Sequence, residues 1–202
     1  MCGIAGYFNP KQNYAENPKQ NFHTLSNMIN TMNHRGPDTY GHKIINSCCL
    51  AHTRLSIIDL ENGRQPMAYK RDENTYYIVY NGEIYNYKEV KKQLLEKNYT
   101  FHTNSDTEVI IAAFCHYGPE FVRELNGIFA IAIYDSMRNT LYLYRDRFGV
   151  KPLYYTKTGD TLVFASRIDT LFEYPRVRPC IDMNSLNEIF SLGPAKTYGK
   201  GV

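Results

Sequence analysis

Short apolar segments bounded by turn residues recur along this chain and predict β-strands. The expected strands are residues 4–8, 43–50, 54–58, 75–80, 128–134, 141–145, 153–156 and 162–165. Several of them are joined by connections of hairpin length, such as residues 135–140 and 157–160, and connections this short require antiparallel pairing. The segment 128–133 is apolar at every position, as expected of a strand that is covered on both faces.

Apolar residues at helical spacing predict a first amphipathic helix over residues 22–34, after a polar loop over residues 9–20. Two further helices are indicated by a capping side chain three residues before an acid: Asn86 with Glu89, and Ser105 with Glu108. A last helix is expected near residues 185–192, before Gly193-Pro194.

The capped helices are apolar on one side only, so each must lie on a sheet. Helices outside and two antiparallel sheets inside satisfy both patterns. We therefore predict an α+β fold, a four-layer αββα sandwich of two stacked antiparallel sheets flanked by helices. Residues 1–190 are expected to form one domain. Residues 191–202 are expected to begin a linker to a further domain that this sequence does not contain.

Composition narrows the class of protein. The chain has 202 residues, and its net charge of +3 is spread over interspersed acidic and basic residues without a basic stripe. Neither nucleic acid nor an anionic membrane is therefore implied as a partner. No apolar run reaches the length of a membrane span and no export signal is visible, so we expect a cytoplasmic protein. The five cysteines and six histidines lack disulfide or metal-ligand spacing, and we expect no metal site.

The residue after the initiator methionine is Cys2, and removal of Met1 gives it a free α-amine beside its thiol. A thiol with an ordinary pKa of about 8.5 is only slightly ionised at neutral pH, whereas an α-amine titrates near pH ~8 and can accept the thiol proton. One residue can then supply both nucleophile and base. The alternative is an ordinary buried cysteine in the first strand, because free cysteine is among the most buried residue types.

The tripeptide Asn81-Gly82-Glu83 follows the predicted strand 75–80. It brings a side-chain amide, an unobstructed backbone N–H and a carboxylate to one strand end. An amide and a backbone N–H are the donors that a tetrahedral oxyanion needs. The alternative is an Asn-Gly hairpin turn, which taken alone is the better interpretation.

Two more charged residues stand beside predicted elements. Arg54 is expected to close a turn and begin the strand 54–58, where its guanidinium can bind a carboxylate through two parallel hydrogen bonds. Asp106 lies just inside the helix capped by Ser105 and can bind an ammonium group, although the helix dipole alone explains an acid there. With Glu83 these residues form the minimum set for the head group of a free amino acid. Arg35, in a predicted tight turn, can favour a thiolate.

Together these segments resemble the class II glutamine amidotransferases, which are N-terminal-nucleophile hydrolases, and in particular the glutaminase half of glutamine-hydrolysing asparagine synthetases. The matching segments are C-G-I-A-G from Cys2, H-R-G-P-D from His34, R-L-S-I-I-D-L from Arg54, Q-P-M from Gln65, Y-N-G-E-I-Y-N-Y from Tyr80, S-D-T-E-V-I from Ser105, L-N-G-I-F-A from Leu125 and R-D-R-F-G-V-K-P-L-Y-Y from Arg145. They cover nearly the whole chain in order. The R-G-P-D and K-P-L-Y-Y segments favour asparagine synthetase over other amidotransferases of the class.

The resemblance implies a role for each matching position. Cys2, freed of Met1, is the expected nucleophile, and Asn81 with the Gly82 backbone N–H is the expected oxyanion hole. The implied glutamine-binding residues are Arg54 for the α-carboxylate, Asp106 and Glu83 for the α-ammonium, and Leu55, Ser56, Ile57 and Ile58 for the pocket wall beside Asn81 and Gly82. The implied reaction releases ammonia and leaves a γ-glutamyl thioester, which water hydrolyses to glutamate.

The resemblance also implies a partner domain. In this family ammonia passes to a C-terminal synthetase domain of the same polypeptide, which activates aspartate with ATP and magnesium. No cofactor is expected on this chain, and a homodimer is compatible with the resemblance. Two alternatives stay open: ammonia transfer to another acceptor, and a non-catalytic module of the same fold. Arg167 stands where the family usually has glutamate, which puts nearby contacts in doubt but does not touch the expected catalytic set.

Overall fold

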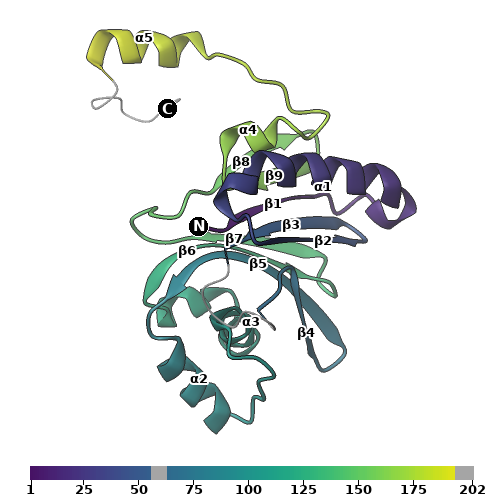
Figure 1. Ribbon diagram of the computed structural model, residues 1–202, viewed down its shortest axis with the longest axis vertical. Helices are drawn as coiled ribbons and strands as arrows, with labels where there is room; N and C mark the ends of the chain where they lie inside the picture. Colours follow the sequence, from purple (N-terminus) through teal and green to yellow (C-terminus); the bar gives the residue numbers. More distant parts are fainter. Residues whose placement is uncertain (56–62, 194–202) are drawn as a thin grey trace.

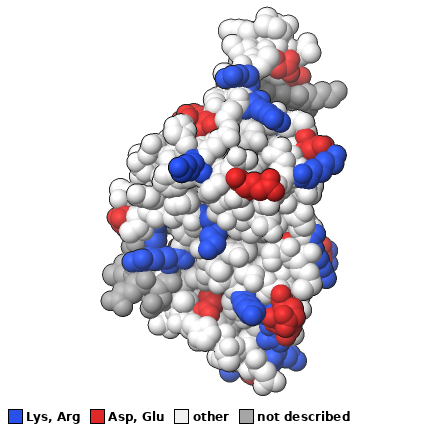
Figure 2. All heavy atoms as spheres, turned by 90° about the vertical axis from the view of Figure 1, so that its right-hand side faces the viewer, with Lys and Arg blue, Asp and Glu red and all other residues white. Residues whose placement is uncertain are grey.

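The computed structural model describes residues 1–55 and 63–193 of the chain. Two antiparallel sheets are stacked face to face, and helices cover the outer face of each (Figure 1). The predicted four-layer αββα sandwich is confirmed. None of the helices in these residues has the length and apolar character that a membrane crossing requires. Acidic and basic side chains are interspersed over the face in Figure 2.

The first sheet has five strands in the order β2-β3-β1-β9-β8. Their bounds are β1 Gly3–Phe8, β2 Thr39–Ile45, β3 Cys48–Arg54, β8 Tyr154–Thr158 and β9 Thr161–Ala165. The second sheet has four strands in the order β4-β5-β6-β7. These are β4 Met67–Arg71, β5 Asn74–Ile84, β6 Gly127–Asp135 and β7 Thr140–Arg145. The N-terminal strand β1 is central in its sheet, so residues 3–7 are buried, whereas Met1 before them is 59% exposed.

The helices form the two outer layers. Their bounds are α1 Pro18–Met32, α2 Tyr87–Glu96, α3 Asp106–Tyr117, α4 Ile168–Leu171 and α5 Met183–Leu192, with 3₁₀ turns η1 Tyr14–Glu16, η2 Asn33–Arg35 and η3 Gly118–Glu124. Helix α1 packs on the five-stranded sheet, α3 packs on the four-stranded sheet, and α2 packs against α3. Helix α5 lies apart from both sheets (Figure 1).

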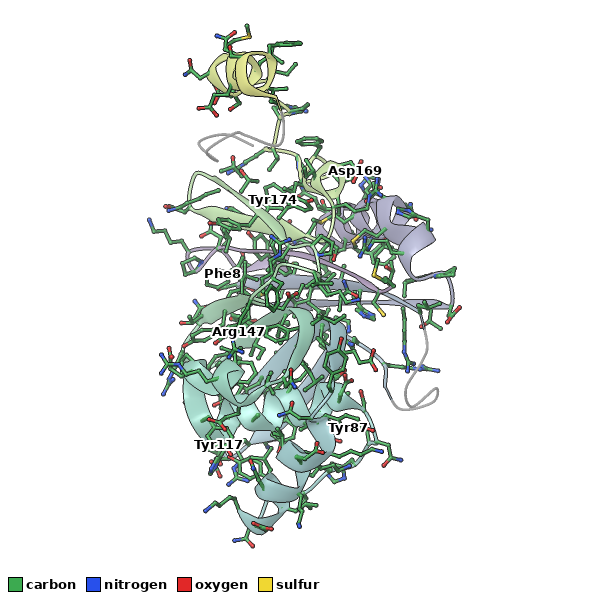
Figure 3. The ribbon with its side chains drawn as sticks, turned by 90° about the vertical axis from the view of Figure 1, so that its left-hand side faces the viewer. Phe8, Tyr87, Tyr117, Arg147, Asp169 and Tyr174 are labelled. Atoms are coloured by element: carbon green, nitrogen blue, oxygen red, sulfur yellow. The ribbon has the colours of Figure 1, made fainter. Side chains whose placement is uncertain are left out.

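Three apolar clusters separate the four layers. Strand β6 contributes to two of them: Ile131 and Ile133 face the helices, whereas Ala130 and Ala132 face the other sheet. This alternation confirms the prediction that residues 128–133 are covered on both faces. Figure 3 shows Phe8 at the level between the sheets. Its ring centroid lies 6.0 Å from that of Tyr134, which belongs to the opposite sheet.

Several predicted boundaries were wrong. The apolar segment 43–50 is two strands, β2 and β3, because Asn46-Ser47 forms the turn between them. Strand β4 was missed, since it is a short edge strand whose apolar residues, Met67 to Tyr69, are followed by the charged pair Lys70-Arg71. Helix α1 begins within the predicted polar loop, at Pro18, because proline suits the first helical turn. The outer end of the predicted linker, residues 194–202, lies outside the described residues, and residue 192 still belongs to α5.

The two predicted helix caps differ. Ser105 accepts a hydrogen bond from the Thr107 N–H at 3.2 Å, as predicted. Asn86 precedes α2 but makes no capping bond, because its amide bridges the backbone of Glu124 and Asn126 instead, at 2.9 and 2.8 Å. The chain before β6 is thereby tied to the start of α2.

Candidate active site

Three strands bring chemically useful side chains to one end of the space between the sheets. Each of these strands contributes to the interlayer core, through Ile4 of β1, Leu50 of β3 and Val79 of β5 among others. Side chains alternate along a strand, so positions an even number of residues away face the same side. Cys2, Arg54 and Asn81 are such positions. The three therefore project from three strands toward one place.

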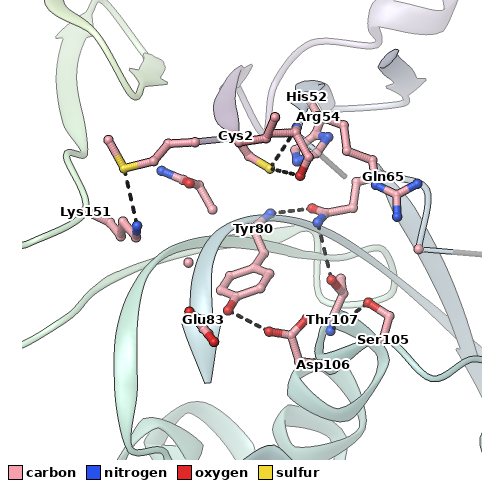
Figure 4. A pocket seen from close by; sticks show the side chains of 15 residues that line it. Cys2, His52, Arg54, Gln65, Tyr80, Glu83, Ser105, Asp106, Thr107 and Lys151 are labelled. Atoms are coloured by element: carbon pink, nitrogen blue, oxygen red, sulfur yellow. Dashed lines mark hydrogen bonds between the residues drawn. The ribbon is translucent and has the colours of Figure 1, made fainter. Parts of the chain in front are cut away.

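A pocket lies at this end of the sandwich (Figure 4). Its volume is about 120 Å³, several times the roughly 10–15 Å³ that one water requires. Seven of the predicted site residues line it: Cys2, Arg54, Leu55, Asn81, Gly82, Glu83 and Asp106. The other three predicted wall residues, Ser56, Ile57 and Ile58, lie outside the described residues. The structure thus brings together every predicted site residue that it describes.

Cys2 is half-buried at the pocket. Its Sγ lies 3.4 Å from the Leu55 nitrogen, which donates to it, and 3.6 Å from the Leu55 oxygen. The Arg35 Nε donates to the Cys2 carbonyl oxygen at 3.1 Å, which places a cation beside this residue. A Cβ on Gly3 would lie 2.7 Å from the Thr53 Oγ1, so only glycine allows this close approach. The thiol is therefore held at a fixed position on the pocket wall.

Met1 precedes Cys2 in this chain, so the Cys2 nitrogen belongs to a peptide bond. The Met1 side chain lines the pocket, and its Sδ accepts a hydrogen bond from the Lys151 Nζ at 3.4 Å (Figure 4). Loss of Met1 frees the amine of Cys2 at the pocket and removes this side chain from its wall.

Asn81 and Gly82 lie within strand β5 and are paired with Ala130 and Phe129 of β6. The prediction that they follow the strand was wrong, and so was the alternative of a hairpin turn. The Asn81 side chain is 2% exposed, and its Nδ2 has no hydrogen-bond partner among the described residues. A Cβ on Gly82 would lie 2.2 Å from the Ile128 oxygen, because the two strands approach closely here. A buried amide N–H without a partner at a pocket is a donor available to a ligand.

Arg54 is the last residue of β3 and not the first residue of a new strand, as had been predicted. Its side chain is buried at the pocket, and its carbonyl oxygen accepts from the Asp38 N–H at 3.0 Å. This bond ties the R-G-P-D segment to the end of β3. A buried guanidinium at one end of the pocket suits a carboxylate ligand.

Asp106 occupies the first turn of α3 and is 5% exposed. Its Oδ2 accepts a hydrogen bond from the Tyr80 hydroxyl at 2.8 Å. Burial raises the pKa of the Asp106 carboxyl, while the Tyr80 hydroxyl and the Ile84 and Thr107 backbone N–H groups oppose this rise. Glu83 is exposed at the pocket rim. The pocket thus offers two carboxylates across from the Arg54 guanidinium.

Besides Met1, six further side chains line the pocket that were not predicted as site residues: His52, Gln65, Tyr80, Ser105, Thr107 and Lys151. Gln65 accepts from the Tyr80 N–H at 2.6 Å and donates to the Thr107 Oγ1 at 3.3 Å, so it joins β5 to α3. His52 is buried, and burial lowers its pKa to about 3. Each of these residues lies within or beside a segment that matches the family, and that position is the sequence signal that could have identified it. No group of His, Cys, Asp or Glu side chains suited to a metal ion occurs in the described part of the chain.

The family model for the glutamine amidotransferase domain matches residues 1–200. The glutamine-hydrolyzing asparagine synthetase 3 of Bacillus subtilis is 39% identical over all of this chain and 32% of its own length. Asparagine synthetase 1 of the same organism is 44% identical over 85% of this chain and 26% of its length. The chain thus spans about a third or less of these relatives.

One solved structure, the glutamine phosphoribosylpyrophosphate amidotransferase of B. subtilis, superimposes with a TM-score of 0.67 at 21% identity, covering 85% of this chain and 43% of that one. This likeness supports the fold. The sequence match covers nearly the whole chain, and the chain belongs to the glutamine amidotransferase domain family.

Proposed function

We propose that this chain hydrolyses glutamine to glutamate and ammonia, with Cys2 as the nucleophile once Met1 is removed. The observation that carries the proposal is the shared pocket: the Cys2 thiol, the unpartnered Asn81 Nδ2, the Arg54 guanidinium and the Asp106 carboxylate all line it. This set matches the four chemical groups of the substrate, namely amide carbon, carbonyl oxygen, α-carboxylate and α-ammonium.

In the first half of the proposed reaction, the α-amine of Cys2 takes the thiol proton and the sulfur attacks the side-chain amide carbon of glutamine. The developing oxyanion accepts hydrogen bonds from the Asn81 Nδ2 and the Gly82 N–H. The protonated amine then gives its proton to the leaving nitrogen. The C–N bond breaks, ammonia departs, and a γ-glutamyl thioester remains on Cys2.

In the second half, the same amine takes a proton from a water molecule, which attacks the thioester carbon. The C–S bond breaks, the proton returns to the sulfur, and glutamate leaves. One glutamine and one water thus give one glutamate and one ammonia. Arg54 and Asp106 hold the substrate head group throughout, so that the amide carbon stays at the sulfur.

The fate of the ammonia belongs to the whole protein. Both relatives described above are named glutamine-hydrolyzing asparagine synthetases, and this chain matches only part of each. We propose that residues 1–190 form the glutaminase domain and that residues 191–202 begin a linker to a synthetase domain. That domain would convert aspartate to asparagine with ATP and magnesium, which are not expected on this chain. We place the protein in the cytoplasm, with a homodimer as one candidate assembly.

The test is ammonia release from glutamine by the purified protein, with the N-terminus defined by intact mass. Protein lacking Met1 should release ammonia, Cys2→Ala should not, and the matched control Cys180→Ala, at an exposed cysteine away from the pocket, should match the wild type. Ammonia release by Cys2→Ala at the wild-type rate would defeat the enzyme assignment and favour a non-catalytic module. Assaying which acceptor the full-length protein amidates separates aspartate from other acceptors.

A further inference from the structure

Tyr80 precedes Asn81 on β5, and the two side chains leave the strand in opposite directions. Asn81 faces the space between the sheets, whereas Tyr80 packs in the apolar cluster beneath α2 and α3. The Tyr80 side chain is 4% exposed and also lines the pocket. Asn81 therefore reaches the candidate oxyanion hole, and its neighbour Tyr80 reaches the opposite wall of the pocket.

Among the described residues the Tyr80 hydroxyl has one hydrogen-bond partner, and it is a site residue. The Tyr80 Oη donates to the Asp106 Oδ2 at 2.8 Å, and both side chains are buried (Figure 4). The Tyr80 N–H donates to the Gln65 Oε1 at 2.6 Å, which fixes the backbone at the same point. A hydrogen bond to an ionised group is shorter and stronger than one between neutral groups. The phenol therefore holds the carboxylate in one orientation.

A phenylalanine would fill the same apolar space, so packing alone does not explain the hydroxyl. Asp106 must stay ionised to bind an ammonium group, and burial works against ionisation by raising its pKa. The Tyr80 hydroxyl offsets part of that rise because it donates to the charged form. Its removal leaves a buried carboxylate with one donor fewer: the Ile84 and Thr107 backbone N–H groups remain, but the side-chain contact that orients Oδ2 is lost.

We propose that Tyr80 is a positioning residue for the α-ammonium group of glutamine, acting through Asp106, and that it makes the pocket select amides carrying a free α-amine. This inference rests on the proposed function. Tyr80 does not touch the reacting amide. Loss of its hydroxyl should therefore weaken substrate binding and leave the rate of the chemical step unchanged.

The test compares Tyr80→Phe with the wild type in steady-state ammonia release. Two substrates are used: glutamine, and the monoamide of glutaric acid, which has the same chain, carboxylate and amide but no α-amine. For Tyr80→Phe we expect the KM for glutamine to rise about tenfold, the size of one charge-assisted hydrogen bond, with kcat within about twofold. The preference for glutamine over the monoamide should fall by the same factor.

A matched control separates positioning from stability. Tyr134 is also buried in the same sheet, and its Oη donates to the Asn139 Oδ1 at 2.9 Å, away from the pocket. Tyr134→Phe also loses one hydroxyl bond, but it should leave the KM and the preference for glutamine unchanged. A second comparison places Tyr80→Phe in an Asp106→Ala background, where it should add no further effect, because the residue through which it acts is gone.

The outcomes decide between the two proposals. An unchanged KM and substrate preference in Tyr80→Phe, or a full Tyr80→Phe effect in the Asp106→Ala background, would overturn the role of Tyr80 and leave the glutaminase intact. Absence of Cys2-dependent ammonia release from the wild type would overturn both. If Tyr80→Phe does not fold, Asp106→Asn serves instead, since it keeps the acceptor for Tyr80 and removes the charge. It should lose the preference for glutamine, and retention of that preference would refute the inference.

Discussion

Replacing Asn81 with alanine should separate catalysis from stability. The Asn81 Nδ2 is buried and has no partner among the described residues, so this donor makes no hydrogen bond that the folded protein would lose. We therefore expect the free energy of unfolding of Asn81→Ala to stay within about 1 kcal/mol of the wild type. The amide is proposed to donate only when charge develops on the substrate oxygen.

The expected loss in rate follows from that role. Removal of one oxyanion-hole donor typically costs about 10²–10³-fold in kcat, or roughly 3–4 kcal/mol of transition-state stabilisation. The KM for glutamine should change little, because Arg54 and Asp106 bind the head group. Steady-state ammonia release gives both constants, and urea unfolding followed by circular dichroism gives the stability.

The matched control lies on the same strand. Asn74 is also a buried asparagine, but both of its side-chain polar atoms are hydrogen-bonded: Nδ2 donates to the Asp135 Oδ1 at 2.8 Å, and Oδ1 accepts from the Ser136 Oγ and the Met137 N–H, each at 3.1 Å. Three hydrogen bonds at about 1 kcal/mol each predict a loss of about 3 kcal/mol in Asn74→Ala. The melting temperature should fall by roughly 6–12 °C, with kcat unchanged.

The two asparagines thus have opposite expected outcomes. A wild-type kcat in Asn81→Ala would contradict the oxyanion-hole role. So would a loss of stability as large as that of Asn74→Ala, with a remaining activity that tracks the folded fraction.

Three more predictions rest on single features. The pKa of His52 falls from 6.5 to about 3 in the folded protein, so between these values the unfolded state binds a proton that the folded state does not. Stability should therefore fall by about 2 kcal/mol between pH ~8 and pH ~5, and urea unfolding of His52→Gln should lack this share of the loss. Gly82→Ala should lower the unfolding midpoint and abolish ammonia release, because its Cβ would lie 2.2 Å from the Ile128 oxygen; wild-type values for both would contradict the close strand approach. Arg54→Lys should raise the KM for glutamine about tenfold or more, because lysine cannot make two parallel hydrogen bonds to the α-carboxylate. An unchanged KM would show that this residue does not bind the substrate.

The fold class was predictable because local patterns carried it. Hairpin-length connections required antiparallel pairing, and the structure has it between β6 and β7. The apolar segment 128–133 required a strand covered on both faces, and β6 is such a strand. Strand ends were harder to predict, because residues such as His52 and Asn81 are polar and look like turn residues in the sequence. Both continue their strands beyond the apolar core, into the pocket. Local propensity predicts that a strand ends where its apolar residues end, whereas backbone pairing with the neighbouring strand continues beyond that point.

The site was predictable to the extent that its residues belong to recognisable segments. Cys2, Arg54, Asn81 and Asp106 come from four segments far apart in the chain, and only the stacking of the two sheets and the packing of α3 bring them to one pocket. Tyr80 was overlooked because an aromatic residue in a strand is ordinarily a core residue, and it is one here. Its second role depends on the hydroxyl bond to the first turn of α3, a contact that no local pattern encodes.

In the proposed reaction the sulfur of Cys2 attacks the glutamine side chain only after Met1 has been removed. The most direct measurement treats the purified protein with the diazoketone analogue of glutamine, which alkylates an attacking thiolate, and maps the adduct by peptide mass spectrometry. We expect one adduct, on peptides that begin with Cys2, and we expect excess glutamine to suppress it. An adduct at equal yield on peptides that still begin with Met1, or on another cysteine in place of Cys2, would contradict the proposed reaction.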